Sequence, residues 1–210
     1  MKEISKLQGI FNKEETALII IDAQVDFCSA KGKLAQILGV DVSRIEKAVP
    51  NLNALILYCR EKGVKIFWIR QELIKEKMYD SQKNRLLDEN GEVWYDIPNT
   101  PGSQWHGTML KPLESEPVIT KYNYCSFKDT TLDLQLKAAN IKSLLITGFT
   151  TGVCVETTAR SGYLNGYNIA VLSDCSDAHT EEEHSSALSI IGTFFGWILT
   201  KKQIEELWEE

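Results

Sequence analysis

The sequence predicts a three-layer α/β/α domain built around a mostly parallel sheet of about six strands. Three observations lead to this fold class. Short apolar segments that favour β structure alternate with segments of helical periodicity, which is the pattern of right-handed strand–helix–strand crossovers. The apolar segments are almost uninterrupted, as expected of parallel strands covered on both faces. The 210 residues show no linker or internal repeat, so we expect a single domain over residues 1–210.

Five segments have the composition of buried strands. β-branched and long aliphatic residues dominate each of them. In chain order they are TALIIID (16–22), VKIFWIR (64–70), EPVITK (116–121), SLLITGF (143–149) and NIAVLSD (168–174).

The connections between these strands contain four predicted helices, over residues 47–62, 130–140, 153–165 and 180–193. Gly63 and Gly166 follow two of them and are typical C-terminal caps. The segment 71–115 is polar and contains PNTPGS, so we expect a long, partly helical excursion over the strand ends. Connections of that length in a compact domain are usually functional.

Charge and hydropathy exclude several classes of function. The net charge is −6 at pH 7 and the densest positive spot is KK at 201–202, which argues against a nucleic-acid partner. The longest apolar run, ALIII (17–21), is too short to span a bilayer, so no membrane partner is expected. The first residues contain no signal-peptide core, and we therefore expect a cytoplasmic protein.

Cysteine usage agrees with a reducing compartment. The five cysteines form no CxxC pair and show no disulfide framework. Cys59 lies on the apolar face of a predicted helix and Cys175 follows a strand, so both are expected to serve packing. Cys28 is expected to be half-buried in the loop after the first strand.

Chemically capable residues follow three of the predicted strands. Asp22 ends the first strand, Lys121 ends the third, and Cys154 lies in the turn after the fourth. In open parallel sheets, ligands bind outside the carboxyl ends of the strands. We therefore expect these three side chains to meet at one edge of the sheet.

A thiol, a carboxylate and an ammonium group can together perform nucleophilic catalysis. The carboxylate can take the thiol proton, and the start of a helix is expected to lower the pKa of Cys154. The backbone N–H of Cys154 and another from the preceding turn could hold the oxyanion of a tetrahedral intermediate. Such a set suits attack on an amide carbonyl, loss of the amine and hydrolysis of the thioester.

Taken one at a time, these residues also have ordinary structural roles. An aspartate at a strand end is most often a cap or turn residue, a lysine there is usually solvated, and a cysteine after a glycine-rich turn more often fills a core. Their joint occurrence at three strand ends favours catalysis.

Three segments resemble motifs of the isochorismatase-like cysteine hydrolases, whose fold is Rossmann-like. They are IIIDAQVDF (19–27), ITKYNYCSF (119–127) and ITGFTTGVCVETTARSGYLNGYNIAVLSD (146–174). The resemblance implies a catalytic triad of Asp22, Lys121 and Cys154. It also implies a cis peptide between Phe149 and Thr150, and an oxyanion hole made by the backbone N–H groups of Thr150 and Cys154.

Within that family the chain is most similar to ureidoacrylate and N-carbamoyl amide hydrolases, on the segments 32–56, 101–107 and 190–198. The resemblance implies a small amide, ureido or N-carbamoyl substrate cleaved at a C–N bond. Phe27 and Tyr124 are expected to wall the substrate site, and Gln71 is expected to hydrogen bond a ureido oxygen. Arg70 has two open interpretations, a partner for a substrate carboxylate or a surface residue at a strand end.

No metal and no cofactor are expected. Nicotinamidases of the same family carry an Asp-x-His motif after the second strand, but the corresponding segment here, IRQELIKEKMYD (69–80), contains no histidine. His179 and His184 lie near a predicted helix start without the carboxylate spacing of a metal site, so they are expected at the surface or as caps.

Three alternatives remain open from the sequence. They are a nicotinamidase-like amidase that lacks the usual metal site, a thiol redox sensor that uses Cys154 with Cys125 or Cys28, and a non-catalytic oligomeric scaffold. The aromatic stretch FFGW (194–197) is expected either in the core or at a subunit interface. The family resemblance implies a homo-oligomer, a dimer or tetramer.

Overall fold

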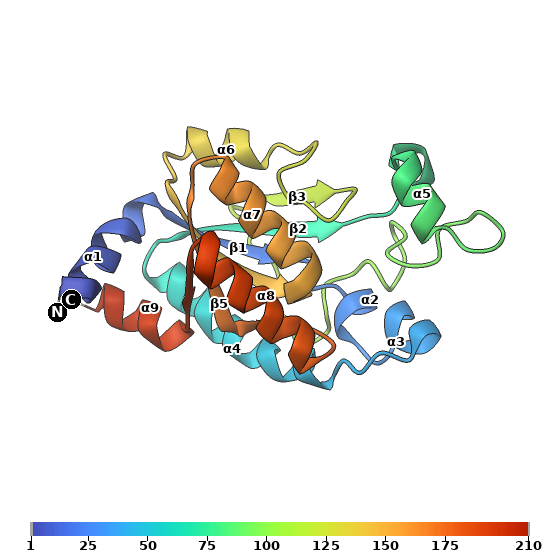
Figure 1. Ribbon diagram of the computed structural model, residues 1–210, viewed down its shortest axis with the longest axis horizontal. Helices are drawn as coiled ribbons and strands as arrows, with labels where there is room; N and C mark the ends of the chain where they lie inside the picture. The colour runs from blue at the N-terminus through green and yellow to red at the C-terminus, as the bar shows by residue number, and fades with distance from the viewer. Residues whose placement is uncertain (1, 210) are drawn as a thin grey trace.

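The computed structural model describes residues 2–209 and has a parallel six-stranded sheet at its centre. The strands lie in the order β3-β2-β1-β4-β5-β6, and every neighbouring pair is parallel. Figure 1 shows the sheet with helices on either side of it. The predicted fold class is confirmed. The two end residues of the expected domain, 1 and 210, lie outside the described residues.

The strands occupy the predicted apolar segments with small shifts at their ends. Strand β1 is central and wholly buried because strands and helices cover all its sides. The bounds are β1 Thr16–Ile21, β2 Lys65–Gln71, β3 Val118–Lys121, β4 Ser143–Phe149, β5 Asn168–Asp177 and β6 Trp197–Leu199.

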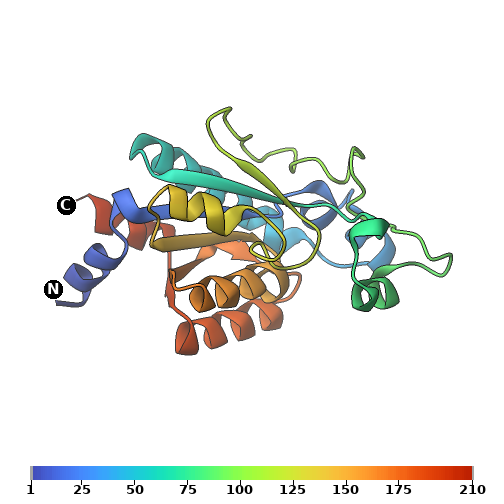
Figure 2. The same ribbon diagram turned by 90° about the horizontal axis from the view of Figure 1, so that it is seen from above.

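Side chains alternate between two apolar cores, one on each face of the sheet, because successive strand residues point in opposite directions. Leu18 and Ile20 face the core beneath α4 (Ser43–Glu61) and α9 (Lys201–Trp208). Ile19 and Ile21 face the core beneath α6 (Leu132–Ala138), α7 (Glu156–Leu164) and α8 (Glu181–Phe194). Figure 2 shows α4 and the pair α7–α8 on opposite sides of the sheet.

The structure contains elements that the sequence patterns did not predict. Helices α1 (Lys2–Ile10), α3 (Lys33–Leu38) and α9 are short. Strand β6 has only three residues and begins at Trp197, the last residue of the aromatic stretch that was expected in a core or at an interface. Helix α4 begins at Ser43, earlier than the predicted 47, because Val42 and Ile45 extend its buried face. Short elements of this kind depend on tertiary contacts more than on local pattern.

The excursion between β2 and β3 is largely irregular, as predicted. It contains a 3₁₀ turn at Lys75–Lys77 and helix α5 (Asp80–Leu86). Asp26, in the short helix α2 (Val25–Cys28), fixes it in place. One Asp26 oxygen accepts from the backbone of Asp96 at 2.7 Å and the other from the backbone of Lys33 at 2.9 Å. Asp26 therefore anchors the excursion to the segment that follows β1.

Gly148 permits the close approach of β4 to the end of β1. Its φ is 106°, and a Cβ atom there would lie 2.0 Å from the Ile21 carbonyl oxygen. We expect Gly148→Ala to lower the free energy of unfolding by at least about 2 kcal/mol in denaturant titration, since it adds backbone strain to this clash.

Gly63→Ala is the matched control for this substitution. Gly63 also has a positive φ, 71°, but a Cβ atom there would meet nothing within 4 Å. Gly63→Ala should therefore lower the free energy of unfolding only through backbone strain, by about 1 kcal/mol. Equal losses in the two variants would contradict the role of close packing at Gly148.

Candidate active site

Three strand ends bring the predicted site residues to one edge of the sheet. Asp22 follows β1 with a left-handed φ of 50°, and its N–H donates to the Ile69 carbonyl oxygen at 3.0 Å. Lys121 is the last residue of β3, and Cys154 lies in the wide helical turn Thr151–Val155 between β4 and α7. Asp22 and Lys121 are fully buried, and the Cys154 side chain is almost so.

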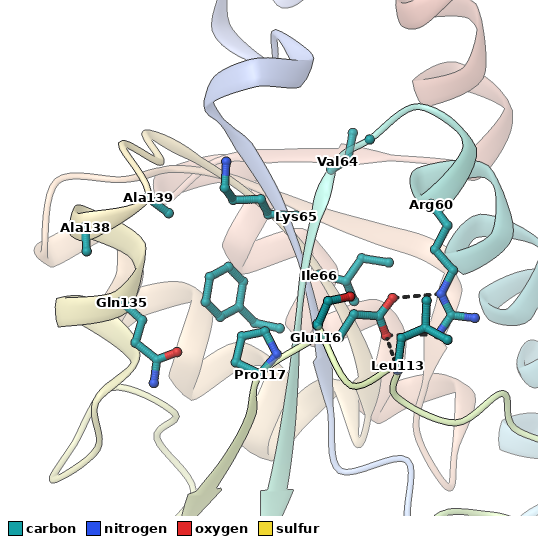
Figure 3. Close-up of a pocket in the computed structure, with 13 residues that line it drawn as sticks. Arg60, Val64, Lys65, Ile66, Leu113, Glu116, Pro117, Gln135, Ala138 and Ala139 are labelled. Carbon is teal, nitrogen blue, oxygen red and sulfur yellow. Dashed lines mark hydrogen bonds and ion pairs between the residues drawn. The ribbon is translucent and has the colours of Figure 1, made fainter.

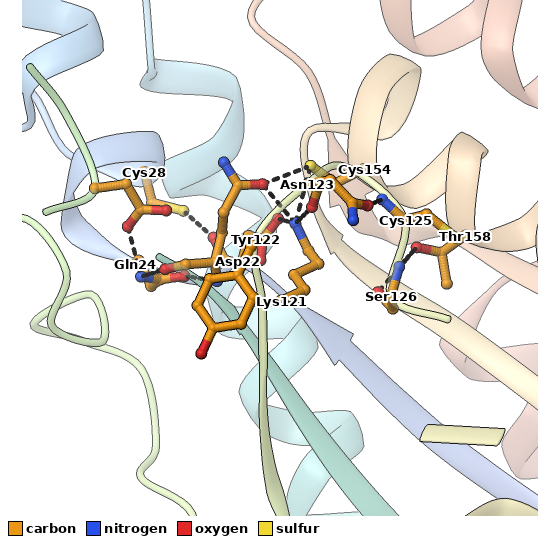
Figure 4. A network of polar contacts seen from close by, with 12 residues as sticks. Asp22, Gln24, Cys28, Lys121, Tyr122, Asn123, Cys125, Ser126, Cys154 and Thr158 are labelled. Atoms are coloured by element: carbon orange, nitrogen blue, oxygen red, sulfur yellow. Dashed lines mark hydrogen bonds and ion pairs between the residues drawn. The ribbon is translucent and has the colours of Figure 1, made fainter. Parts of the chain in front are cut away.

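Lys121 connects the carboxylate and the thiol. Its Nζ lies 2.7 Å from Asp22 Oδ2 and 3.4 Å from Cys154 Sγ, and Figure 4 shows it reaching between the other two residues. The same nitrogen donates to the Asn123 carbonyl oxygen at 3.0 Å. The structure thus brings together all three residues of the expected triad.

Gln71, at the end of β2, lies between these strands and joins the same cluster. Its Oε1 accepts from Lys121 Nζ at 2.6 Å and faces Cys154 Sγ at 3.7 Å. Its Nε2 is buried and donates to none of the described groups. A buried amide N–H without a partner costs free energy. A ligand that accepted a hydrogen bond from Nε2 would remove that cost.

Asp22 and Lys121 form a buried ion pair. Burial raises the pKa of Asp22 above its ordinary value, and the ammonium of Lys121 opposes that rise. For Lys121, burial lowers the pKa, but Asp22, Cys154 and Asp96 outweigh this effect and raise it overall. Each charge of the pair therefore opposes the effect of burial on the pKa of its partner.

The expectation of a lowered pKa at Cys154 is wrong. Burial raises the pKa of this thiol well above 9.0, and the Asp22 carboxylate raises it further, while Lys121 acts in the opposite direction. Desolvation outweighs the field of a helix start at so buried a sulfur. In the free protein Cys154 is a neutral thiol beside the Asp22–Lys121 pair.

The segment before Cys154 has the expected cis peptide between Phe149 and Thr150. The Thr150 carbonyl oxygen accepts from Val153 N at 3.2 Å and from Val155 N at 3.3 Å, which closes the turn. The Thr150 N–H donates to none of the groups in residues 2–209.

A cavity of about 420 Å³ opens over the thiol. Of the predicted substrate-binding residues, Phe27 and Tyr124 line it, whereas Gln71 contacts the cysteine without lining the cavity. The remaining lining residues were not predicted as such. They are Leu34, Tyr95, Thr150, Gly152, Val153, Glu156, His179, Glu183, Ser186, Ala187 and Ile190. Several come from α8, which packs over the turn Thr151–Val155 that carries Cys154, here called the nucleophile turn. No local pattern in the sequence indicates this packing.

A larger cavity, about 680 Å³, lies at the opposite end of β2 and offers no comparable chemistry (Figure 3). Its buried carboxylate, Glu116, is already satisfied by Arg60, by the indole N–H of Trp68 at 2.7 Å and by the Leu113 N–H at 3.0 Å. The cavity over Cys154 is therefore the candidate active site.

Comparison with known proteins agrees with this geometry. The family model described as the isochorismatase domain matches residues 16–203. The chain belongs to the isochorismatase family. Ureidoacrylate amidohydrolase RutB of Cronobacter sakazakii is 30% identical to it over 202 residues, covering 90% of this chain and 86% of that protein. RutB of Acinetobacter baylyi is 28% identical, with coverage of 88% and 80%.

Solved structures of the isochorismatase family share the fold. An isochorismatase-like hydrolase from Alkaliphilus metalliredigens has a TM-score of 0.78 and 26% identity, covering 94% of this chain and 100% of that one. Nicotinamidase PncA from Bacillus subtilis has a TM-score of 0.74 and 22% identity, covering 89% and 99%. At that identity the second likeness shows the fold alone.

Three further observations concern a metal site, a membrane span and the position of Cys28. Residues 2–209 contain no group of three or more His, Cys, Asp and Glu side chains that could hold a metal ion. No helix among them is long and apolar enough to cross a membrane. Cys28 is fully buried rather than half-buried, and it lies in the core on the opposite face of the sheet from Cys154.

Arg70 points to the excursion rather than to the cavity. Its guanidinium donates to the Ser103 carbonyl oxygen at 3.0 Å and pairs with Glu72 at 3.3 Å. Two interpretations were left open by the sequence, a partner for a substrate carboxylate or a surface residue. Arg70 does not line the cavity over Cys154, and its side chain is half-buried rather than at the surface.

Gln24 is a supporting residue that the sequence analysis missed. Its Oε1 accepts from the Gln71 N–H at 2.8 Å, and its Nε2 donates to the Gln71 carbonyl oxygen at 3.0 Å and to Asp96 Oδ1 at 2.7 Å. These bonds fix the end of β2 and hence the Gln71 side chain. Gln24 lies in IIIDAQVDF (19–27), one of the segments that resemble the family motifs. That resemblance was the signal in the sequence that could have pointed to a role for Gln24 in the site.

Asp96 is a buried acid of this network. Its side chain is inaccessible to solvent and its Oδ2 has no hydrogen-bond partner among the described residues. Burial, followed by the charge of Asp22, raises the pKa of Asp96 to about 9. The folded protein therefore holds a proton on Asp96 at neutral pH, whereas the unfolded chain releases it above about 4.

We expect Asp96→Asn to stabilise the protein more at pH 8 than at pH 5. Because the pKa of Asp96 is raised in the folded state, the wild type loses stability as pH rises from about 4 toward 9, and asparagine removes this loss. Asn suits the left-handed φ of 53° at this position and keeps the oxygen bonded to Gln24. The free energy of unfolding of Asp96→Asn minus that of the wild type should grow by about 2 to 4 kcal/mol from pH 5 to pH 8. An unchanged difference would show that Asp96 is ionised in the folded protein.

Proposed function

We propose that this chain is a cysteine-dependent amidohydrolase that cleaves a C–N bond of a small linear amide, ureido or N-carbamoyl compound. The observation that carries the proposal is the position of Lys121 Nζ, in contact with both Asp22 and Cys154 beneath an open cavity. The names of the RutB relatives support a ureido substrate.

Asp22 is the proton acceptor in this mechanism. As Cys154 Sγ attacks the carbonyl carbon, its proton passes to Asp22, so the buried cluster keeps its net charge throughout the step. Lys121 stays an ammonium ion, holds Asp22 in place before the transfer and stabilises the thiolate as it forms. This coupling explains how a thiol with a raised pKa can act as a nucleophile, because the thiolate is formed only in the presence of substrate.

The tetrahedral intermediate carries its negative charge on the former carbonyl oxygen. The N–H groups of Thr150 and Cys154 stabilise that oxyanion. Asp22 then returns the proton to the leaving amine, the C–N bond breaks, and a thioester remains on Cys154. Water, deprotonated by Asp22, attacks the thioester and releases the acid, and the proton returns to sulfur. Overall one water is consumed and one amide bond is broken.

The cavity has the properties of a site for a small, largely neutral substrate. Phe27, Tyr95 and Tyr124 form aromatic walls. The volume of the cavity suits a small-molecule substrate. Gln71 lies beside Cys154 without lining the cavity, and its Nε2 has no hydrogen-bond partner among the described residues. In this proposal Nε2 donates to an oxygen of the acyl group that Cys154 attacks. Phe27 and Tyr124 would hold the planar amide between them.

A substrate panel tests this function. The purified protein would be incubated with N-carbamoyl, ureido and biuret-like compounds and with nicotinamide, and ammonia release would be followed with and without a chelator. We expect turnover of a ureido or N-carbamoyl compound that the chelator leaves unchanged. Selective turnover of nicotinamide, or loss of activity with the chelator, would contradict the proposal.

A further inference from the structure

His184 makes a buried contact with the nucleophile turn. It was predicted at the surface or as a cap, but the residue is only 8% exposed. Its Nδ1 lies 2.9 Å from the hydroxyl oxygen of Thr151, which is fully buried. Thr151 is the first residue of the turn that carries Cys154, and it directly follows Thr150.

The surroundings of the ring favour one direction for this hydrogen bond. Burial lowers the pKa of His184, and the positive charge of Arg44 lowers it further. Asp177, Glu181 and the backbone of Ser173 raise the pKa but do not outweigh burial. A neutral ring has one donor and one acceptor nitrogen. We assign the N–H to Nε2, so that Nδ1 accepts from the Thr151 hydroxyl at 2.9 Å.

The ring lies beside a fixed frame of charged groups. Asp177, at the end of β5, lies 3.7 Å from Nδ1 and is engaged by Arg44 of α4 at 3.1 Å and by the Ala178 N–H at 2.8 Å. The hydrogen bond to Thr151 ties the nucleophile turn to α8, and Arg44 connects α8 to α4 and β5 by pairing with both Glu181 and Asp177. No step of the proposed mechanism uses this contact.

We propose that His184 is a positioning residue for the oxyanion site: by accepting the Thr151 hydroxyl, it fixes the turn that presents the Thr150 and Cys154 N–H groups. This inference rests on the amidohydrolase function proposed above. The contact acts on the transition state, because those N–H groups meet their full negative charge only in the tetrahedral intermediate.

Substitutions at both partners separate this role from simple packing. Thr151→Val keeps the shape of the side chain but removes the hydroxyl, and we expect kcat to fall by about 10- to 100-fold with KM nearly unchanged, less than the loss of a whole oxyanion donor. Thr151→Ser keeps the hydroxyl and should restore most of kcat. At His184, asparagine places an acceptor oxygen near the position of Nδ1 and should rescue activity, whereas glutamine and leucine should not.

A double substitution tests whether the two residues act through one bond. Thr151→Val combined with His184→Leu should have a kcat within about twofold of the lower single variant, because both changes remove the same interaction. Independent, multiplying losses would overturn the proposal. Circular dichroism and thermal midpoints identify variants that fail to fold, and Thr151→Val remains decisive if His184→Leu is one of them.

An aldehyde analogue of the best substrate measures the oxyanion site directly. The Cys154 sulfur adds to the aldehyde carbon and the oxygen occupies the oxyanion site. Its Kd should rise in Thr151→Val by the same factor as kcat falls, while substrate binding to Cys154→Ala should not change when Thr151→Val is added. A wild-type kcat in Thr151→Val, or a loss confined to KM or to thermal stability, would overturn this inference alone. Turnover by Cys154→Ala would instead overturn the proposed function.

Discussion

Replacing Cys154 with alanine is expected to abolish turnover, with a fall in kcat of about 10⁴- to 10⁶-fold. The geometry places this sulfur beside both Lys121 and the cavity. Without it no thioester forms, and the remaining groups can only orient water. Ammonia release under saturating substrate measures the effect.

The same substitution should leave folding and substrate binding nearly intact. Cys154 is a small side chain at the cavity wall, so its truncation removes little packing. Calorimetric titration of Cys154→Ala with the substrate should give a Kd close to the wild-type value. Substantial residual turnover in this variant, with full occupancy by substrate, would contradict a covalent mechanism.

Asp22→Asn is expected to lower kcat by about 10²- to 10⁴-fold, because asparagine cannot accept the thiol proton. It should also lower the free energy of unfolding by about 3 kcal/mol. The second effect follows from the full burial of the pair, since Lys121 would keep a charge with no carboxylate 2.7 Å away.

Asp22→Asn combined with Lys121→Met separates the two effects. The double variant removes both charges, so it should recover most of the lost stability, as measured by denaturant titration, and remain inactive. If Asp22→Asn retained wild-type activity, another group would have to accept the proton, and the assignment of Asp22 as the base would be wrong.

Much of the fold follows from local sequence patterns. The five apolar segments predicted as strands are strands, because continuous β-branched and aliphatic residues suit positions buried on both faces. Asp22, Lys121 and Cys154 could be placed at one edge of the sheet for the same reason, as parallel strands share the orientation of their carboxyl ends.

What the sequence does not contain is the set of contacts between distant elements. His184 looks like a surface residue of an amphipathic helix, and only the packing of α8 over the nucleophile turn buries it. The pKa of Cys154 was mispredicted because its burial depends on tertiary contacts with distant residues such as Gln71 and Lys121, and desolvation outweighs the nearby helix start. Gln24 and Asp96 form their network through an irregular excursion that has no periodicity to analyse.

The central claim, an acyl intermediate on Cys154, is tested most directly by partitioning with hydroxylamine. Two substrates with the same acyl group and different leaving amines would be turned over by the wild-type protein in increasing hydroxylamine, and hydroxamate and acid would be quantified. A shared thioester predicts the same hydroxamate-to-acid ratio for both substrates at every concentration, even if the intermediate never accumulates. A ratio that depends on the leaving amine would show that water attacks the amide directly, and the account would be wrong.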